Sequence, residues 1–152
     1  LKKNTKDKKN IAVLNCDATS KNMLDFELKD VKFDKILIDA PCSGWGVFRS
    51  KPEMKIYQNS MEVSEIIKVQ KQILRNAINY LAPGGEIVYS TCTINKEENE
   101  DIIIDFLNEF DFEVKREQDI ELICGVDGAN GITLKPSVFD SDGFYMCKLK
   151  RK

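Results

Sequence analysis

The sequence contains no histidine and only one tryptophan among its 152 residues. Acyl transfer by a cysteine usually recruits a histidine base, so the absence of histidine disfavours cysteine-protease chemistry. The cysteines also form no Cys-X-X-Cys pair, which together with the lack of histidine disfavours a zinc site. We therefore expect no metal centre.

Long hydrophobic runs are missing as well. No apolar stretch approaches the roughly 20 residues that a membrane-spanning helix needs, and no signal peptide opens the chain. The five cysteines are odd in number and irregularly spaced, which argues against a disulfide framework and for a reducing compartment. These features predict a cytoplasmic protein without a membrane partner.

Neither sign of charge predominates, since the chain has 23 basic and 25 acidic residues and a net charge of −2. Binding to nucleic-acid phosphates depends on lysine and arginine, so this sum alone does not favour an RNA partner. The distribution is more informative, because Arg49, Lys51 and Lys55 follow a cysteine motif. These three residues are candidate RNA contacts, and a solvated loop is an equal alternative.

The hydrophobic pattern predicts an α/β protein with an open sheet. The continuous apolar run over residues 33–38 predicts a central strand covered on both faces. The sequence Ala82-Pro83-Gly84-Gly85 is expected to end the helix predicted before it. We expect a single domain over residues 1–152, with residues 1–10 frayed and a long loop over residues 40–59. The expected strands cover residues 11–16, 33–38, 86–91, 112–115 and 144–149, and the expected helices cover residues 61–81 and 95–110.

Two cysteines follow predicted strands, Cys42 in Asp39-Ala40-Pro41-Cys42-Ser43-Gly44 and Cys92 in Ser90-Thr91-Cys92-Thr93. Ligands and chemistry collect beyond the carboxyl ends of strands in open α/β sheets, so both thiols belong to one candidate reaction centre. Cys16, Cys124 and Cys147 lack such a context and are expected to be inert apolar residues.

Methylation at carbon 5 of a pyrimidine suits a thiol beside a carboxyl group. A thiolate that adds to carbon 6 makes carbon 5 nucleophilic, and a carboxyl group such as Asp39 can hold or protonate the ring nitrogen. A second thiol can then assist proton loss and release. Methylation of an exocyclic amine by an Asp-X-Pro loop is a weaker interpretation, because it leaves Cys92 without a role.

Three blocks of the sequence carry a family resemblance: DAPCSGWGVFRSKPEMK, LAPGGEIVYSTCTINKEENE and SDGFYMCKLKRK. In this order and spacing they resemble the Sun/Nol1/NOP2 family of RNA cytosine-5 methyltransferases, with the bacterial 16S ribosomal RNA (RsmB-like) branch as the nearest. The resemblance implies a Rossmann-like methyltransferase fold with a mostly parallel open sheet and an antiparallel closing strand. It also implies S-adenosylmethionine as the cofactor and RNA, most simply ribosomal RNA, as the partner.

The resemblance assigns roles to individual residues. Cys92 matches the nucleophile that attacks carbon 6, and Cys42 matches the cysteine that assists product release. Asp39 matches the carboxylate that touches both cytosine and cofactor, while Pro41 shapes that cofactor-binding loop. Asp17 matches the acidic residue that meets the adenine of the cofactor. Asp17 and Asp39 are otherwise turn or helix caps.

The chain departs from this family before residue 11, where the family's Gly-rich cofactor loop and ribose-binding acid are expected. The resemblance also implies that the first two strands of the family's sheet are absent from these 152 residues, so we expect an N-terminally truncated fold. The sheet edge must then be exposed, pair directly with residues 11–16, or be completed by the missing N-terminal half or another chain. The alternative to a catalytic part of a longer enzyme is an inactive fragment with weak RNA or partner binding. Trp45 is larger than the residue expected from the family in the loop after Cys42. Its side chain either stacks on an RNA base or fills the gap left by the missing strands.

Overall fold

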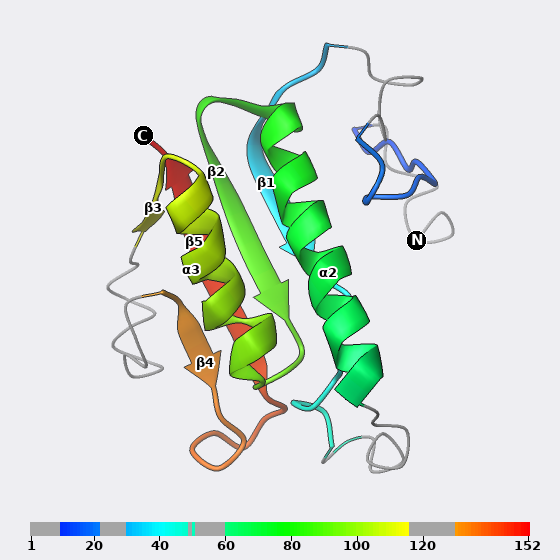
Figure 1. The fold of residues 1–152 in the computed structure, drawn as a ribbon, viewed down its shortest axis with the longest axis vertical. Helices are drawn as coiled ribbons and strands as arrows, with labels where there is room; N and C mark the ends of the chain where they lie inside the picture. Colours follow the sequence, from blue (N-terminus) through cyan, green and yellow to red (C-terminus); the bar gives the residue numbers. More distant parts are fainter. Residues whose placement is uncertain (1–9, 22–29, 49, 51–59, 116–129) are drawn as a thin grey trace.

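The computed structural model describes residues 10–21, 30–48, 50, 60–115 and 130–152, and all structural statements refer to these. Its helices and strands alternate in the manner of an α/β protein (Figure 1). In chain order they are β1 (Phe33–Asp39), α2 (Ser60–Ala77), the 3-10 helix η2 (Ile78–Tyr80), β2 (Leu81–Thr91), the 3-10 helix η3 (Lys96–Glu98), α3 (Glu100–Glu109), β3 (Phe112–Lys115), β4 (Ile132–Leu134) and β5 (Phe144–Arg151).

The strands form one sheet in the order β1-β2-β5-β3, with β4 also paired to β5. β1 and β2 are parallel and are joined through α2, the long crossover that a parallel pair requires. β5 is antiparallel to β2, β3 and β4, so parallel pairing does not predominate among the described residues. The predicted α/β fold with an antiparallel closing strand is confirmed.

Both long helices lie on the same face of the sheet (Figure 1). The strands alternate in burial, as Tyr145, Cys147 and Leu149 of β5 illustrate, and their buried side chains meet the apolar stripes of the helices. The core includes Ile38, Ala40, Leu74, Ala77, Ile78, Leu81, Ile87, Tyr89, Ile102, Ile103, Phe106, Phe112, Tyr145, Cys147 and Leu149.

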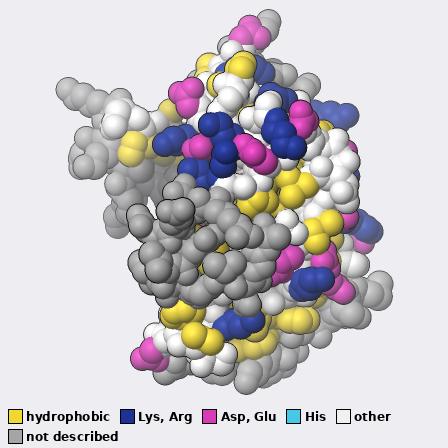
Figure 2. Space-filling model, turned by 90° about the vertical axis from the view of Figure 1, so that its left-hand side faces the viewer, with side chains coloured by type: hydrophobic (Ala, Val, Ile, Leu, Met, Phe, Trp, Pro, Cys, Tyr) yellow, Lys and Arg dark blue, Asp and Glu magenta, His cyan; other side chains and the backbone are white. Residues whose placement is uncertain are grey.

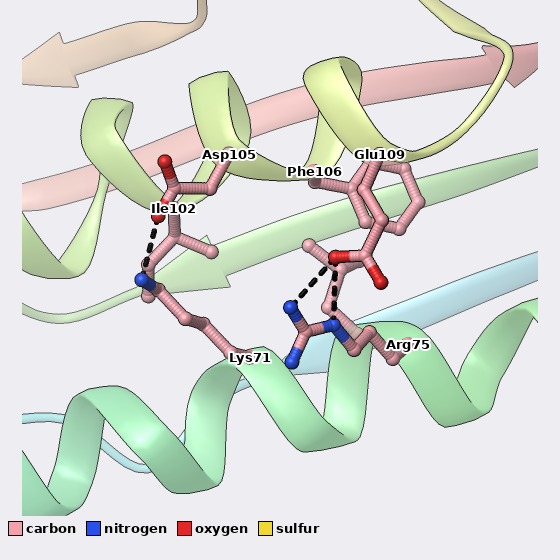
Figure 3. Close-up of a pocket in the computed structure, with 7 residues that line it drawn as sticks. Lys71, Arg75, Ile102, Asp105, Phe106 and Glu109 are labelled. Atoms are coloured by element: carbon pink, nitrogen blue, oxygen red, sulfur yellow. Dashed lines mark hydrogen bonds and ion pairs between the residues drawn. The ribbon is translucent and has the colours of Figure 1, made fainter.

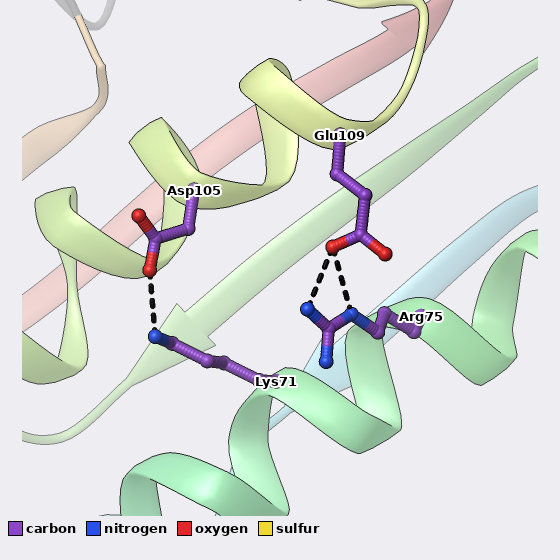
Figure 4. Close-up of polar contacts among 4 residues, drawn as sticks. All are labelled: Lys71, Arg75, Asp105 and Glu109. Carbon is purple, nitrogen blue, oxygen red and sulfur yellow. Dashed lines mark hydrogen bonds and ion pairs between the residues drawn. The ribbon is translucent and has the colours of Figure 1, made fainter.

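Two ion pairs join α2 to α3 across a narrow groove (Figures 3 and 4). Lys71 Nζ lies 2.6 Å from Asp105 Oδ2, and Arg75 donates from Nε and Nη2 to Glu109 Oε2 at 3.0 and 2.6 Å. All four side chains are partly exposed, so each pair contributes at most about 1 kcal/mol. Between the ion pairs the groove is lined by the core residues Leu74, Ile102 and Phe106, of which Ile102 and Phe106 are labelled in Figure 3.

The first predicted strand, residues 11–16, is wrong: this segment is not a strand, and Ile11 and Cys16 are exposed. The central position predicted for β1 is also wrong. β1 pairs with β2 alone among the described strands, and its Leu37 is 72% exposed. A strand needs a hydrogen-bonded neighbour. In the described structure, neither residues 11–16 nor the residues between them and β1 form a strand that pairs with β1, so this edge of β1 is open.

The boundary between α2 and β2 also differs from the prediction. The helix ends at Ala77 and β2 begins at Leu81, so the Ala82-Pro83-Gly84-Gly85 turn predicted to end the helix lies within the strand. The pairing with β1 shifts between Phe33 and Lys35, whose partners are Leu81 and Glu86. Gly84 has φ +71°, which a glycine adopts without strain. The Ala82-Pro83-Gly84-Gly85 segment therefore forms an irregularity within β2.

Candidate active site at the ends of β1 and β2

The thiols of Cys42 and Cys92 lie side by side, with 2.9 Å between their Sγ atoms. The parallel register explains this, because Asp39 of β1 stands opposite Ser90 of β2. The next amide, that of Ala40, donates to the carbonyl of Ser90 at 2.9 Å. Cys42 follows Ala40 by two residues, and Cys92 follows Ser90 by two residues. The parallel pairing of β1 and β2 therefore places the two thiols side by side.

The thiols of Cys42 and Cys92 are both half-buried. Burial raises the pKa of the Cys42 thiol well above its ordinary value, and the hydrogen bond with Cys92 raises it further. Cys42 therefore keeps its proton near neutral pH and can donate it toward the neighbouring sulfur. Burial also raises the pKa of Cys147, a residue of β5 whose side chain lies in the core as an inert apolar group.

The carboxyl group of Glu98 fastens the loop that follows Cys42. It accepts hydrogen bonds from the amide and hydroxyl of Ser43 at 2.9 and 2.5 Å, from Gln70 Nε2 at 3.0 Å and from Asn95 Nδ2 at 3.1 Å. Glu98 is fully buried. A buried carboxyl group with four donors is a strong local constraint, because a buried carboxyl group without such partners would cost free energy.

Sequence patterns missed this role of Glu98. Asn95 caps the 3-10 helix η3, because its side chain accepts from the amide of Glu97 at 3.2 Å, and Glu98 three residues later has the spacing of an ordinary capping box. The signal is weak in the sequence, because a buried partner such as Gln70 lies 28 residues away on α2. Gln70 also donates to the carbonyl of Pro41 at 2.7 Å, so α2 holds the Cys42 loop directly at Pro41 and through Glu98 at Ser43.

A third loop closes the site through glycine backbone contacts. The amide of Gly46 donates to the carbonyl of Cys92 at 3.0 Å, and the amide of Gly143 donates to the carbonyl of Gly46 at 2.7 Å. A Cβ atom on Gly46 would lie 2.1 Å from the Gly143 oxygen, so only glycine allows this approach. The loops after β1, after β2 and before β5 therefore meet beside the thiols.

We expect Glu98→Gln to lower the free energy of unfolding by about 2–3 kcal/mol, because the new amide presents donors to groups that already donate. Urea unfolding followed by circular dichroism measures this effect. Glu109→Gln is the matched control, since the Glu109 carboxylate is half-exposed and pairs only at the surface with Arg75, so a loss below about 1 kcal/mol is expected. Equal losses in the two variants would contradict the role assigned to Glu98.

The candidate cofactor contacts lie at the surface. Asp39 ends β1 and Pro41 follows it, and both are exposed. Asp17 is exposed too, and its Oδ1 accepts from the amide and hydroxyl of Thr19 at 2.8 and 2.7 Å, which lowers the pKa of its carboxyl group. The candidate RNA contacts Arg49, Lys51 and Lys55 lie outside the described residues, as does Cys124.

Charges of both signs are interspersed on the face shown in Figure 2. Elsewhere in the described structure, surface ion pairs include Lys115–Glu113 at 2.7 Å and Lys152–Asp111 at 3.5 Å. None of the helices in the described ranges has the length and apolar character to cross a membrane. Over those same ranges, no cluster of three His, Cys, Asp or Glu side chains is arranged to hold a metal ion.

Comparisons with known proteins identify relatives of this chain. The probable ribosomal RNA small subunit methyltransferase B of Bacillus subtilis is 32% identical over 156 residues, which cover 99% of this chain and 34% of the relative. The ribosomal RNA small subunit methyltransferase F of Shewanella loihica is 34% identical, over 93% of this chain and 29% of the relative. The chain thus spans about a third of the length of these relatives.

A solved structure has the same fold. NSun6 from Pyrococcus horikoshii, crystallised with SFG, superposes with a TM-score of 0.81 and 27% identity, over 99% of this chain and 37% of that one. The family model described as 16S rRNA methyltransferase RsmB/F matches residues 1–150. The chain belongs to the 16S rRNA methyltransferase RsmB/F family.

Proposed function

We propose that this chain supplies the reacting thiols of an enzyme that methylates carbon 5 of cytosine in RNA, with small-subunit ribosomal RNA as the substrate class. The observation that carries the proposal is the pair of thiols 2.9 Å apart at the carboxyl ends of two parallel strands. Methylation of an exocyclic amine needs no thiol, whereas carbon 5 chemistry uses both. The names of the relatives support a ribosomal RNA substrate.

In the proposed reaction Cys92 is the nucleophile. Its thiolate forms a bond to carbon 6 of the cytosine, and the ring electrons move to carbon 5. Carbon 5 then forms a bond to the methyl carbon while the bond between that carbon and the donor sulfur breaks, so that the donor leaves as a neutral thioether. Asp39 holds the ring at its nitrogen while charge develops there. Loss of the carbon 5 proton to water then expels Cys92 as a thiolate, which restores both the aromatic ring and the free enzyme.

S-adenosylmethionine is the cofactor proposed for this reaction, and it supplies an electrophilic methyl group on a sulfonium when it is bound. The residues present fit such a ligand in their chemistry, because an exposed acidic side chain at Asp39 suits its ammonium group and one at Asp17 suits the amino group of its adenine. We assign Asp39 and Pro41 to its amino-acid end and Asp17 to its adenine. The fold also agrees with that of NSun6, which was solved with SFG.

The test is the identity of the product. We expect the protein, supplied with methyl-labelled S-adenosylmethionine and an unmodified small-subunit ribosomal RNA transcript, to place the label in 5-methylcytidine. Nuclease digestion and mass spectrometry of the nucleosides measure this. Label in N4-methylcytidine would overturn the carbon 5 assignment, and no label in any nucleoside would favour the inactive fragment.

A further inference from the structure

A cleft beside the two thiols has no part in the chemistry described above. It has a volume of about 490 Å³ and is lined by Trp45, Gly46 and Phe48, by Ile94, and by residues 135–137. This volume falls within the range of roughly 300–1,000 Å³ that is usual for small-ligand sites. The cleft is therefore large enough for a nucleobase.

The backbone fixes the cleft relative to the reacting sulfur atoms. Gly46 in its wall donates to the carbonyl of Cys92, and Ile94 in its wall is two residues from that cysteine. The lining segments come from the loops after β1 and β2 and from the β4–β5 connection, which gather at the lower end of the sheet in Figure 1. A base in the cleft is thus a close neighbour of a base held at Cys92.

The lining has the character of a stacking site. Trp45 and Phe48 bring aromatic rings, and Ile94 adds an apolar surface that is 43% exposed. The indole Nε1 of Trp45 is buried and has no acceptor among the described residues. Lys135 at the rim brings a positive charge, which suits a phosphate-linked ligand. Single-stranded RNA bases are held by such aromatic surfaces.

We propose that this cleft binds the nucleobase adjacent to the target cytosine in the RNA, stacked on Trp45. The proposal rests on the proposed function, since the neighbouring base is defined by a cytosine at Cys92. Stacking there would hold the RNA in register while the target base stands away from its neighbours. The cleft would then contribute to the choice of sequence around the modified cytosine.

Trp45 is the only tryptophan of the chain, so its fluorescence reports on this cleft alone. We expect a short single-stranded RNA with one central cytosine to quench the tryptophan emission of the 152-residue chain. The same RNA with abasic nucleotides on both sides of the cytosine should quench far less. Unchanged emission at saturating RNA, or equal quenching by the abasic RNA, would overturn the proposal.

Variants give an independent readout with labelled RNA and fluorescence anisotropy. Trp45→Ala should weaken binding by about tenfold, and Trp45→Phe should retain most of the affinity, because a phenyl ring still stacks. Val138→Ala is the control, since Val138 is 70% exposed and is not among the residues that line the cleft, so its affinity should be unchanged. Where Trp45→Ala fails to fold, the wild-type quenching still decides.

The two proposals fail separately. Quenching by RNA without formation of 5-methylcytidine would overturn the proposed function and leave the cleft as an RNA site. Formation of 5-methylcytidine with equal efficiency in the abasic and intact RNAs would overturn the cleft and leave the function.

Discussion

Cys92→Ala is expected to reduce the formation of 5-methylcytidine by more than about 1,000-fold, because carbon 5 has no other route to a nucleophilic state. The thiol of Cys92 is half-buried and borders a loop fixed by Gly46, so its loss leaves the fold in place. The measurement is single-turnover methylation of RNA with saturating S-adenosylmethionine. Cys16→Ala is the control, because that cysteine is exposed and lies in a segment that forms no strand, and its rate should equal that of the wild type.

A second measurement separates a missing nucleophile from a misfolded site. RNA with 5-fluorocytosine at the target position should form a stable covalent adduct with the wild-type protein, since fluorine at carbon 5 cannot leave as a proton does. Cys92→Ala should form no adduct on a denaturing gel, while Cys16→Ala should form as much as the wild type. Methylation by Cys92→Ala at more than a tenth of the wild-type rate would contradict the assignment of the nucleophile.

The candidate site could be predicted from sequence where it depends on strand ends. Apolar runs identify β1 and β2, and a parallel pair places the residues that follow each strand at one edge of the sheet. Cys42 and Cys92 meet for that reason. Asp39, Asp17 and Pro41 remain predictions as cofactor contacts, because their surface positions agree with the role without demonstrating it.

Other features depend on contacts between distant residues, which no local pattern encodes. The four donors to Glu98 come from three separate segments, and the cap-like pattern near Asn95 conceals them. The strand predicted over residues 11–16 illustrates the opposite error. Its apolar sequence satisfies the local rule for a strand, yet the described structure provides no neighbour to pair with it.

The open edge of β1 has the same origin. An apolar run predicts burial on both faces, but burial depends on what packs against the strand. In the described structure α2 covers one face of the sheet (Figure 1). Ile38 of β1 is buried, while its neighbour Leu37 is 72% exposed. The turn residues Pro83 and Gly84 likewise interrupt a strand instead of ending a helix, because pairing with β1 extends back to Leu81.

Cys42→Ala is expected to leave the protein covalently attached to its RNA after methyl transfer. A thiol with a raised pKa stays protonated near neutral pH, and at 2.9 Å it can donate a hydrogen bond to the sulfur of Cys92 as that sulfur departs. Without this donor the departing thiolate is less stable, so release should slow by about 100-fold or more. A denaturing gel after incubation with RNA and S-adenosylmethionine measures the trapped adduct.

The same experiment distinguishes release from attack. Cys42→Ala should still transfer one methyl group per protein at a rate within about tenfold of the wild type, because Cys92 remains in place to attack. The double variant with Cys92→Ala should form no adduct, which identifies Cys92 as the attached residue. Multiple turnover by Cys42→Ala at the wild-type rate, with no adduct on the gel, would show that the hydrogen bond between the two sulfur atoms has no role in release.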